Sequence, residues 1–177
     1  MRHTAVSDLL ELVQVRRSTR ADAPTVIAAI ETVCDEEIFF QTDSFVPDRH
    51  WEAVLYRPES VPQHLLAVAK LEGQIIGHIR LFSGVCGVKD RHVAELGVLV
   101  LSPFRGQGVG QLLMAHALDW AGERDLKKMV LSVFATNREA IKLYKRFGFV
   151  LEGTRKMQYN IGGQYVDELL MAKFLSD

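Results

Sequence analysis

The chain has 177 residues, of which 48% are hydrophobic and 24% are charged, and its formal net charge at pH 7 is −1. This length suits one compact domain, and the composition is ordinary for a soluble globular protein. Acidic and basic residues are interspersed, so no basic patch favours nucleic acid or an anionic membrane surface, and we expect neither as a partner.

The N-terminal residues and the cysteines indicate the expected compartment. Residues 1–12 mix leucines with charged side chains and contain no long apolar run, so we expect neither a signal peptide nor a membrane anchor. We treat them as an N-terminal extension of a single domain at 13–177. Cys34 and Cys86 lack metal-ligand and disulfide spacing, so both are expected to be core thiols of a cytoplasmic protein.

The first half of the domain is predicted to contain a strand, two helices and a β-hairpin. Residues 18–22 provide helix-start chemistry for the apolar-periodic run after them, and Glu72-Gly73 is a turn between two strand patterns. The predicted elements are a strand at 13–17, a helix through 26–33, an aromatic and polar loop at 39–45, a short helix at 51–56 and strands at 65–71 and 74–82.

The second half begins with a nearly continuous apolar strand at 92–101, which runs directly into a glycine-rich segment and an amphipathic helix. After this helix we predict a buried strand at 128–135, a helix at 137–147 closed by Gly148, and a hairpin of strands at 149–160 and 164–174. This order predicts an α/β (α+β) fold with a mixed sheet, and it disfavours a doubly wound dinucleotide fold.

The glycine-rich segment Arg105-Gly106-Gln107-Gly108-Val109-Gly110 opens the amphipathic helix, where unpaired N–H groups and the positive end of the helix dipole meet. Such a turn can bind phosphate, and Arg105 could add a charge-assisted contact. Close packing of a helix on a sheet requires the same glycines, so packing remains an alternative. The segment has neither the Gly-Lys-Ser/Thr ending of a P-loop nor the βαβ context of a dinucleotide site.

Two segments of the second half carry sharp motifs. Residues 98–110 are similar to the motif Arg/Gln-x-x-Gly-x-Gly/Ala that follows the fourth strand of the GNAT superfamily of N-acetyltransferases. Residues 137–149 are similar to its signature Asn-x-x-Ala-x-x-Leu-Tyr-x-x-x-Gly-Phe, with every marked position kept. One departure is that Ser102 takes the family's usual proline place. The resemblance implies a GNAT-type, mostly antiparallel sheet of about seven strands flanked by about four helices.

The resemblance also implies acetyl-CoA as co-substrate. In the family, the coenzyme pyrophosphate lies on the amides of the glycine-rich turn, and the pantetheine arm pairs like an added strand with the end of the fourth strand. A β-bulge in that strand aims an N–H at the thioester oxygen, and Leu99 or Val100 is the candidate for it. The implied coenzyme-binding residues are Val98, Leu99, Val100, Arg105, Gly106, Gln107, Gly108, Val109, Gly110, Gln111 and Asn137, of which Asn137 is also a predicted helix cap.

Acetylation of an amine requires a proton acceptor, because an aliphatic ammonium has a pKa of about 10.4. Glu95 is the candidate base, directly or through water, since it interrupts an apolar strand where a charge is costly. The alternative is that Glu95 faces solvent or pairs with an arginine. Tyr144 resembles the family's tyrosine that protonates the leaving thiolate, although an aromatic on that helix face could equally be core. The histidines show no paired spacing, so no metal is expected.

The resemblance therefore implies an acetyl-CoA-dependent N-acetyltransferase acting on a primary amine, such as an amino acid or an amine antibiotic. Acetylation of a protein or peptide amine, and a non-catalytic acyl-CoA-binding module, stay open as alternatives. In the family the acceptor side is built by the first two helices, their loop, here 39–45, and the last hairpin, here 155–165. The sequence does not decide the oligomeric state, and a homodimer is left open.

Overall fold

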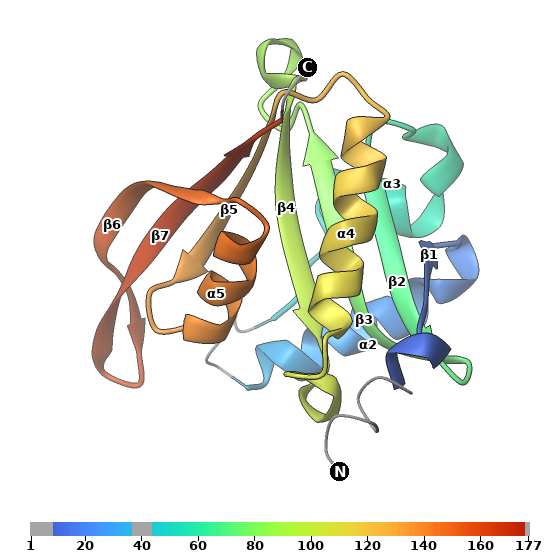
Figure 1. Cartoon of the computed structure of the whole chain (residues 1–177), viewed down its shortest axis with the longest axis horizontal. Helices are drawn as coiled ribbons and strands as arrows, with labels where there is room; N and C mark the ends of the chain where they lie inside the picture. The colour runs from blue at the N-terminus through green and yellow to red at the C-terminus, as the bar shows by residue number, and fades with distance from the viewer. Residues whose placement is uncertain (1–8, 37–43, 176–177) are drawn as a thin grey trace.

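The computed structural model describes residues 9–36 and 44–175. Their centre is a seven-stranded sheet in the order β1-β2-β3-β4-β5-β7-β6, with helices on both faces (Figure 1). Every neighbouring pair is antiparallel except β4 and β5, which are parallel, so the predicted mixed sheet is confirmed. The strands are β1 (Gln14–Arg17), β2 (Leu65–Leu71), β3 (Gln74–Ser83), β4 (Val93–Val100), β5 (Lys128–Phe134), β6 (Val150–Ile161) and β7 (Gln164–Phe174).

The helices agree closely with the periodicity of the sequence. They are α2 (Ala23–Cys34), α3 (Arg49–Tyr56), α4 (Val109–Gly122) and α5 (Arg138–Arg146). Most of the predicted loop at 39–45 lies outside the described residues. At the N-terminal end, residues 9–12 are helical and Leu9 packs partly buried against the core. No helix in the described ranges is long and apolar enough to cross a membrane.

The core forms two layers, one on each face of the sheet. On one face, which we call the α4 face, Leu113 and Met114 of α4 pack over strand residues such as Ile79. On the other, the α2 face, Ile30 of α2 and Leu55 of α3 are buried with residues of the same central strands. Successive side chains of a strand alternate between the two faces, so these apolar strands supply both layers.

The sheet opens between β4 and β5. The two strands pair only from Val93↔Lys128 to Glu95↔Val130, whereas β4 continues along β3 and β5 continues along β7. Figure 1 shows the two strands close together where they begin and diverging toward their C-terminal ends, with α4 and α5 on the same face on either side of the opening. This opening is where the functional site is to be sought.

Two details differ from the expectations. The register of β3 with β4 is regular from Ser83↔Ala94 to Gly77↔Val100, so the bulge expected in β4 is wrong: the opening arises where pairing with β5 stops, without an extra residue in β4. Cys34 is buried, but Cys86 is exposed, because it lies in the loop after β3, where its neighbour Val85 packs against the core and the Cys86 side chain does not.

Candidate active site

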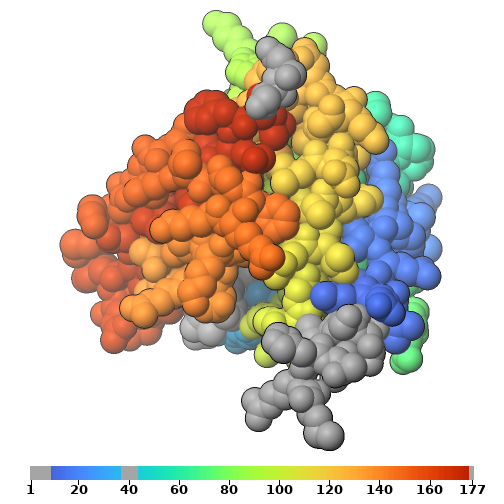
Figure 2. All heavy atoms as spheres, in the orientation of Figure 1, coloured from blue at the N-terminus to red at the C-terminus, as the bar shows by residue number. Residues whose placement is uncertain are grey.

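A cavity of about 1080 Å³ lies where β4 and β5 part. Its walls come from both faces of the sheet: Leu143 and Tyr144 of α5 contribute from the α4 face, and Trp51 and Arg80 contribute from the α2 face. Figure 2 shows the surface receding between α5 and the beginning of α4. A ligand that enters beside α4 can therefore meet a second ligand that enters from the α2 face.

The backbone of β4 offers a free edge to this cavity. Leu101 N–H donates to Ile76 O at 3.0 Å and Gly84 N–H donates to Val93 O at 3.3 Å, so the odd-numbered residues of this segment face β3. Since the direction of the N–H and C=O groups alternates along a strand, those of Val98 and Val100 face the opening. An extended ligand with amide groups could add here like a further strand.

This alternation decides between the two candidates for the thioester contact. The N–H of Leu99 points to β3, where Leu99 is the cross-strand partner of His78. The suggestion that the Leu99 N–H contacts the thioester oxygen is therefore wrong. The N–H of Val100 faces the opening and remains a candidate. The Val100 carbonyl accepts a hydrogen bond from Arg105 Nε at 2.7 Å, which ties the end of β4 to the glycine-rich turn.

The glycine-rich turn, residues 105–111, lies between β4 and α4. Gly106 and Gly108 adopt left-handed φ values of 70° and 90°, which glycine tolerates best, and Gly108 is the N-cap of α4. Gly106, Gly108, Gly110 and Gln111 line the cavity. The first N–H groups of a helix point out of its N-terminal end, so the turn presents an anion-binding surface at the cavity wall.

Two of the predicted coenzyme residues do not line the cavity. Val109 is buried in the core at 1% exposure, and the Gln107 side chain donates to Pro103 O at 2.6 Å. Neither side chain therefore faces the cavity. The sequence pattern alone could not separate their side chains from those that face the cavity, because the turn is irregular.

Two of the glycines lie closest to side chains of other segments, and neither of these side chains comes from the sheet. A Cβ at Gly108 would lie 2.9 Å from Leu10 Cδ1, and a Cβ at Gly110 would lie 3.2 Å from Leu143 Cδ2. A Cβ at Gly106 would meet no atom within 4 Å. Side chains at Gly108 and Gly110 would therefore meet protein atoms first, whereas Gly106 is required mainly by its backbone conformation.

Arg105 fastens the turn to the end of α2. Its Nη1 and Nη2 donate to the two carboxylate oxygens of Glu36 at 2.6 and 2.8 Å. Together with the hydrogen bond to the Val100 carbonyl, this bidentate pair engages the guanidinium in contacts within the protein. In this arrangement Arg105 shapes the glycine-rich turn by holding its backbone.

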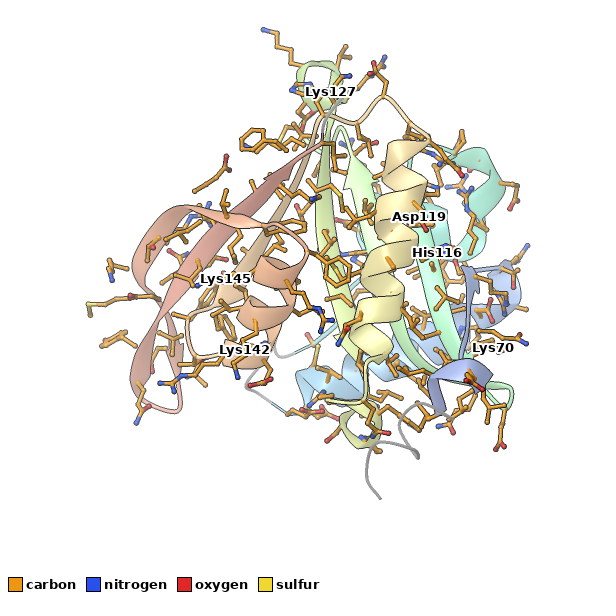
Figure 3. The ribbon with its side chains drawn as sticks, in the orientation of Figure 1. Lys70, His116, Asp119, Lys127, Lys142 and Lys145 are labelled. Atoms are coloured by element: carbon orange, nitrogen blue, oxygen red, sulfur yellow. The ribbon has the colours of Figure 1, made fainter. Side chains whose placement is uncertain are left out.

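The helix α5 forms the wall opposite α4. Asn137 caps it, since its Oδ1 accepts from Ala140 N–H at 3.2 Å, and the predicted cap is confirmed. Arg138, Lys142 and Arg146 line the cavity and give this wall positive charge. Figure 3 labels Lys142 and Lys145 on α5, as well as His116 and Asp119 on α4; of these four, only Lys142 belongs to the lining.

Tyr144 belongs to the core and to the cavity wall at once. It is 6% exposed, and its ring lies 6.0 Å from that of Phe149 between centroids. Burial raises the pKa of Tyr144 to about 12, against a smaller lowering by the positive charge of Arg80. The phenol therefore keeps its proton at neutral pH and can donate it or a hydrogen bond.

Glu95 lies on the α2 face of the opening and pairs with Arg80. Arg80 Nη2 donates to Glu95 Oε1 at 2.8 Å, which confirms the ion pair foreseen as an alternative. The side chains are 45% exposed for Glu95 and 20% for Arg80, and both line the cavity. A Cβ at Gly97, the cross-strand partner of Arg80, would lie 2.9 Å from Arg80 Nε, so glycine leaves room for Arg80 to lie across β4.

Sequence reasoning missed Arg80 and His78. His78 is 3% exposed and lines the cavity, and neither ring nitrogen has a hydrogen-bond partner among the described residues. Burial, and then the charge of Arg80, lower the pKa of His78 to about 3, so its ring is neutral. The available signal was polar side chains at alternate positions of an apolar strand, the same signal that identified Glu95.

The predicted acceptor segments are placed differently. Phe45, from the loop before α3, lines the cavity beside Trp51, at 5.1 Å between ring centroids. Residues 155–165 do not line it, because β6 is the outer strand and β7 separates it from β5. The role of this hairpin on the acceptor side stays a prediction. Within the ranges that the structure describes, no group of three His, Cys, Asp or Glu side chains could hold a metal ion.

Comparisons with known proteins agree with this geometry. The family model described as Acetyltransferase (GNAT) family matches residues 27–149. L-amino acid N-acetyltransferase AaaT of Escherichia coli (strain K12) is 32% identical over 131 residues, which cover 71% of this chain and 76% of that protein. Phosphinothricin N-acetyltransferase of Streptomyces coelicolor is 29% identical over 159 residues, which cover 88% and 92%.

A solved structure shows the same fold. It is a GNAT superfamily phosphinothricin acetyltransferase from Sinorhizobium meliloti in complex with AcCoA, with a TM-score of 0.82 at 18% identity. The alignment covers 93% of this chain and 89% of that one. The fold of the two chains is therefore shared over nearly their whole lengths.

Proposed function

The chain belongs to the acetyltransferase (GNAT) family of enzymes that acetylate amines with acetyl-CoA, and we propose that its acceptor is a small primary amine bound in the cavity between β4 and β5. The observation that carries this proposal is the opening of the sheet. There the free edge of β4, the protonated Tyr144 and the carboxylate of Glu95 border one cavity.

The residues of the α4 face fit acetyl-CoA, which supplies an acetyl group on a good leaving thiol. The amides of residues 105–111 would hold the pyrophosphate, and Arg138, Lys142 and Arg146 would add positive charge around the phosphates. The edge of β4 at Val98 and Val100 would pair with the amides of the pantetheine arm. These contacts would bring the thioester to the opening, next to Tyr144.

Glu95 and Tyr144 would manage the two protons of the transfer. The bound ammonium first loses one proton to solvent through Glu95, and as the neutral amine nitrogen then forms its bond to the acetyl carbon, its second proton passes to Glu95, directly or through water. As the carbon–sulfur bond breaks, Tyr144 donates its proton to the sulfur, and solvent restores it. Arg80 holds the Glu95 carboxylate at 2.8 Å, which keeps the proton acceptor at the opening.

The proposal is tested by ligand-dependent stability and by thiol release. Acetyl-CoA at a hundredfold excess over its Kd should stabilise the fold by about 2.7 kcal/mol, which calorimetry or a thermal shift assay would register. Free thiol should then appear in the presence of amino acids or other small amines. If acetyl-CoA at millimolar concentration leaves the melting temperature unchanged, the coenzyme site is elsewhere or absent.

Two finer attributes are proposals as well. We place the enzyme in the cytoplasm, because Cys34 and Cys86 are both free thiols and an exposed one persists best in a reducing compartment. We also propose a homodimer, for which the exposed apolar residues Val150, Leu151 and Met157 of the outer strand β6 are the best support. Light scattering during gel filtration would distinguish a dimer from a monomer.

A further inference from the structure

The cation on the α2 face of the cavity retains unused hydrogen-bond donors. Arg80 makes one hydrogen bond within the described residues, from Nη2 to Glu95 Oε1, although a guanidinium has five N–H donors. The side chain is 20% exposed and borders the cavity. A partly buried guanidinium with spare donors is suited to a planar anion, above all a carboxylate.

The surroundings of Arg80 hold it in one orientation. Its guanidinium carbon lies 4.8 Å from the centroid of the Phe82 ring and 5.6 Å from that of Trp51. Gly97 provides the space across β4 that the side chain occupies. Because these contacts restrict the side chain before any ligand binds, little further conformational entropy is lost on binding.

The other cations that line the cavity have different positions. Arg105 is bound to Glu36 and Val100. Arg138, Lys142 and Arg146 all lie on α5, on the α4 face of the sheet. On the acceptor side, Asp48 accepts from the N–H groups of His50 and Trp51 as the N-cap of α3. Arg80 is thus the guanidinium that an acceptor on the α2 face would meet.

The pair of Arg80 and Glu95 presents opposite charges side by side to the cavity. An α-amino acid carries the complementary pair, a carboxylate and an ammonium separated by one carbon atom. We propose that the acceptor is an α-amino acid, whose carboxylate binds Arg80 while its ammonium lies at Glu95. This inference rests on the proposed function and names the substrate class of the same site.

His78 and the aromatic residues complete this subsite. His78 lies two residues before Arg80 on the same face of β3, and its unpaired ring nitrogens supply both a donor and an acceptor to the bound amino acid. Trp51 packs edge-on against His78 at 5.9 Å and borders the cavity with Phe45. These two rings form an apolar wall for the side chain of the amino acid.

The test compares amino acids with the amines that lack only the carboxylate: leucine with isopentylamine, and phenylalanine with phenethylamine. Charge-assisted hydrogen bonds predict that kcat/KM for each amino acid exceeds that for its amine by about 10- to 100-fold. In Arg80→Gln this ratio should fall toward 1, mainly through a higher KM for the amino acid. Arg80→Lys should keep part of the ratio, and Arg91→Gln, an exposed arginine outside the cavity, should keep all of it.

Other outcomes would overturn the inference separately from the function. Equal kcat/KM values for amino acid and amine in the parent enzyme would overturn carboxylate recognition and leave the acetyltransferase assignment intact. If Arg80→Gln lowers kcat/KM equally for the amino acid and the amine, Arg80 only positions Glu95, and this result also overturns the inference. If no amine gives thiol release, calorimetry can instead compare the binding of leucine and isopentylamine to the enzyme with coenzyme A. Equal affinities would then overturn carboxylate recognition by Arg80. An unchanged acetyl-CoA thermal shift verifies that each variant is folded.

Discussion

At the scale of single residues, burial gives several side chains two roles. Tyr144 fills the core beside Phe149 and borders the cavity, so its ring and its hydroxyl serve different purposes. Burial raises the pKa of Tyr144 to about 12, so the hydroxyl is protonated at neutral pH, as a proton donor must be. A substitution that removes only the hydroxyl separates the two roles.

We expect Tyr144→Phe to lower kcat by about 100-fold while changing the KM for acetyl-CoA little, because the ring still packs the core. General acids contribute about 10²- to 10⁴-fold, and a thiolate needs less help than an alkoxide, so the lower end applies. Steady-state kinetics with the best amine would measure this. Glu95→Gln is the companion variant, and loss of its carboxylate should move the pH optimum upward, since the amine must then arrive neutral. A parent-like rate in Tyr144→Phe would assign the tyrosine to packing alone.

At the scale of elements, the turn between β4 and α4 depends on contacts with other parts of the chain. Arg105 binds Glu36 at the end of α2, and Gly108 leaves space for Leu10 near the N-terminus. The turn is therefore held in shape by both flanking segments as well as by its own glycines.

The glycines of the turn should differ in how much stability they contribute. Gly106→Ala adds a Cβ in open space and costs only the strain of a left-handed φ, about 1–2 kcal/mol. Gly108→Ala has the same kind of strain and also approaches Leu10 at 2.9 Å, so it should lower the melting temperature further. Thermal unfolding of the two variants without ligand provides the measurement. Equal melting temperatures would mean that Leu10 moves aside without cost.

At the scale of the whole molecule, buried histidines couple stability to pH. The pKa of His78 falls from its ordinary 6.5 to about 3, and burial also lowers the pKa of His64. Between pH 6.5 and 3 the unfolded chain thus binds protons that the folded chain does not. The contribution of the neutral histidines to the free energy of unfolding is therefore fully present above pH 6.5, and it is lost as the pH falls through this window. The Arg16 hydrogen bond lowers the pKa of Asp22, which adds a loss only below pH 3.8.

We expect the free energy of unfolding to fall by up to about 1.4 kcal/mol per pH unit below pH 6.5 from His78 alone. His78→Leu should remove this part of the slope and unfold at lower pH, because an apolar side chain replaces an unpaired polar one in the core. Denaturant titrations at pH 7, 6 and 5 would measure the slope. His116→Gln, on α4 and outside the cavity, is the control that should retain it. If the free energy of unfolding of His78→Leu still falls as steeply with pH as that of the parent, groups other than His78 cause the pH dependence.

The sequence by itself determined the order of the elements, the cap at Asn137 and the two motifs that identify the family, because periodicity, capping and turn chemistry are local properties of the chain. It also pointed to Glu95, since a charge in an apolar strand is visible without knowledge of its neighbours. The C-terminal strand was predicted with the bounds it has, Gln164–Phe174.

Only the tertiary structure decided how these residues meet. The partners Arg105 and Glu36 are 69 positions apart, and Arg80 reaches Glu95 only through the register of β3 on β4. The side of β4 that faces the opening, which excludes the Leu99 amide, likewise follows from which strand pairs on each edge. Contacts of this kind depend on chain folding over long separations and on backbone direction, neither of which a local pattern of residues encodes.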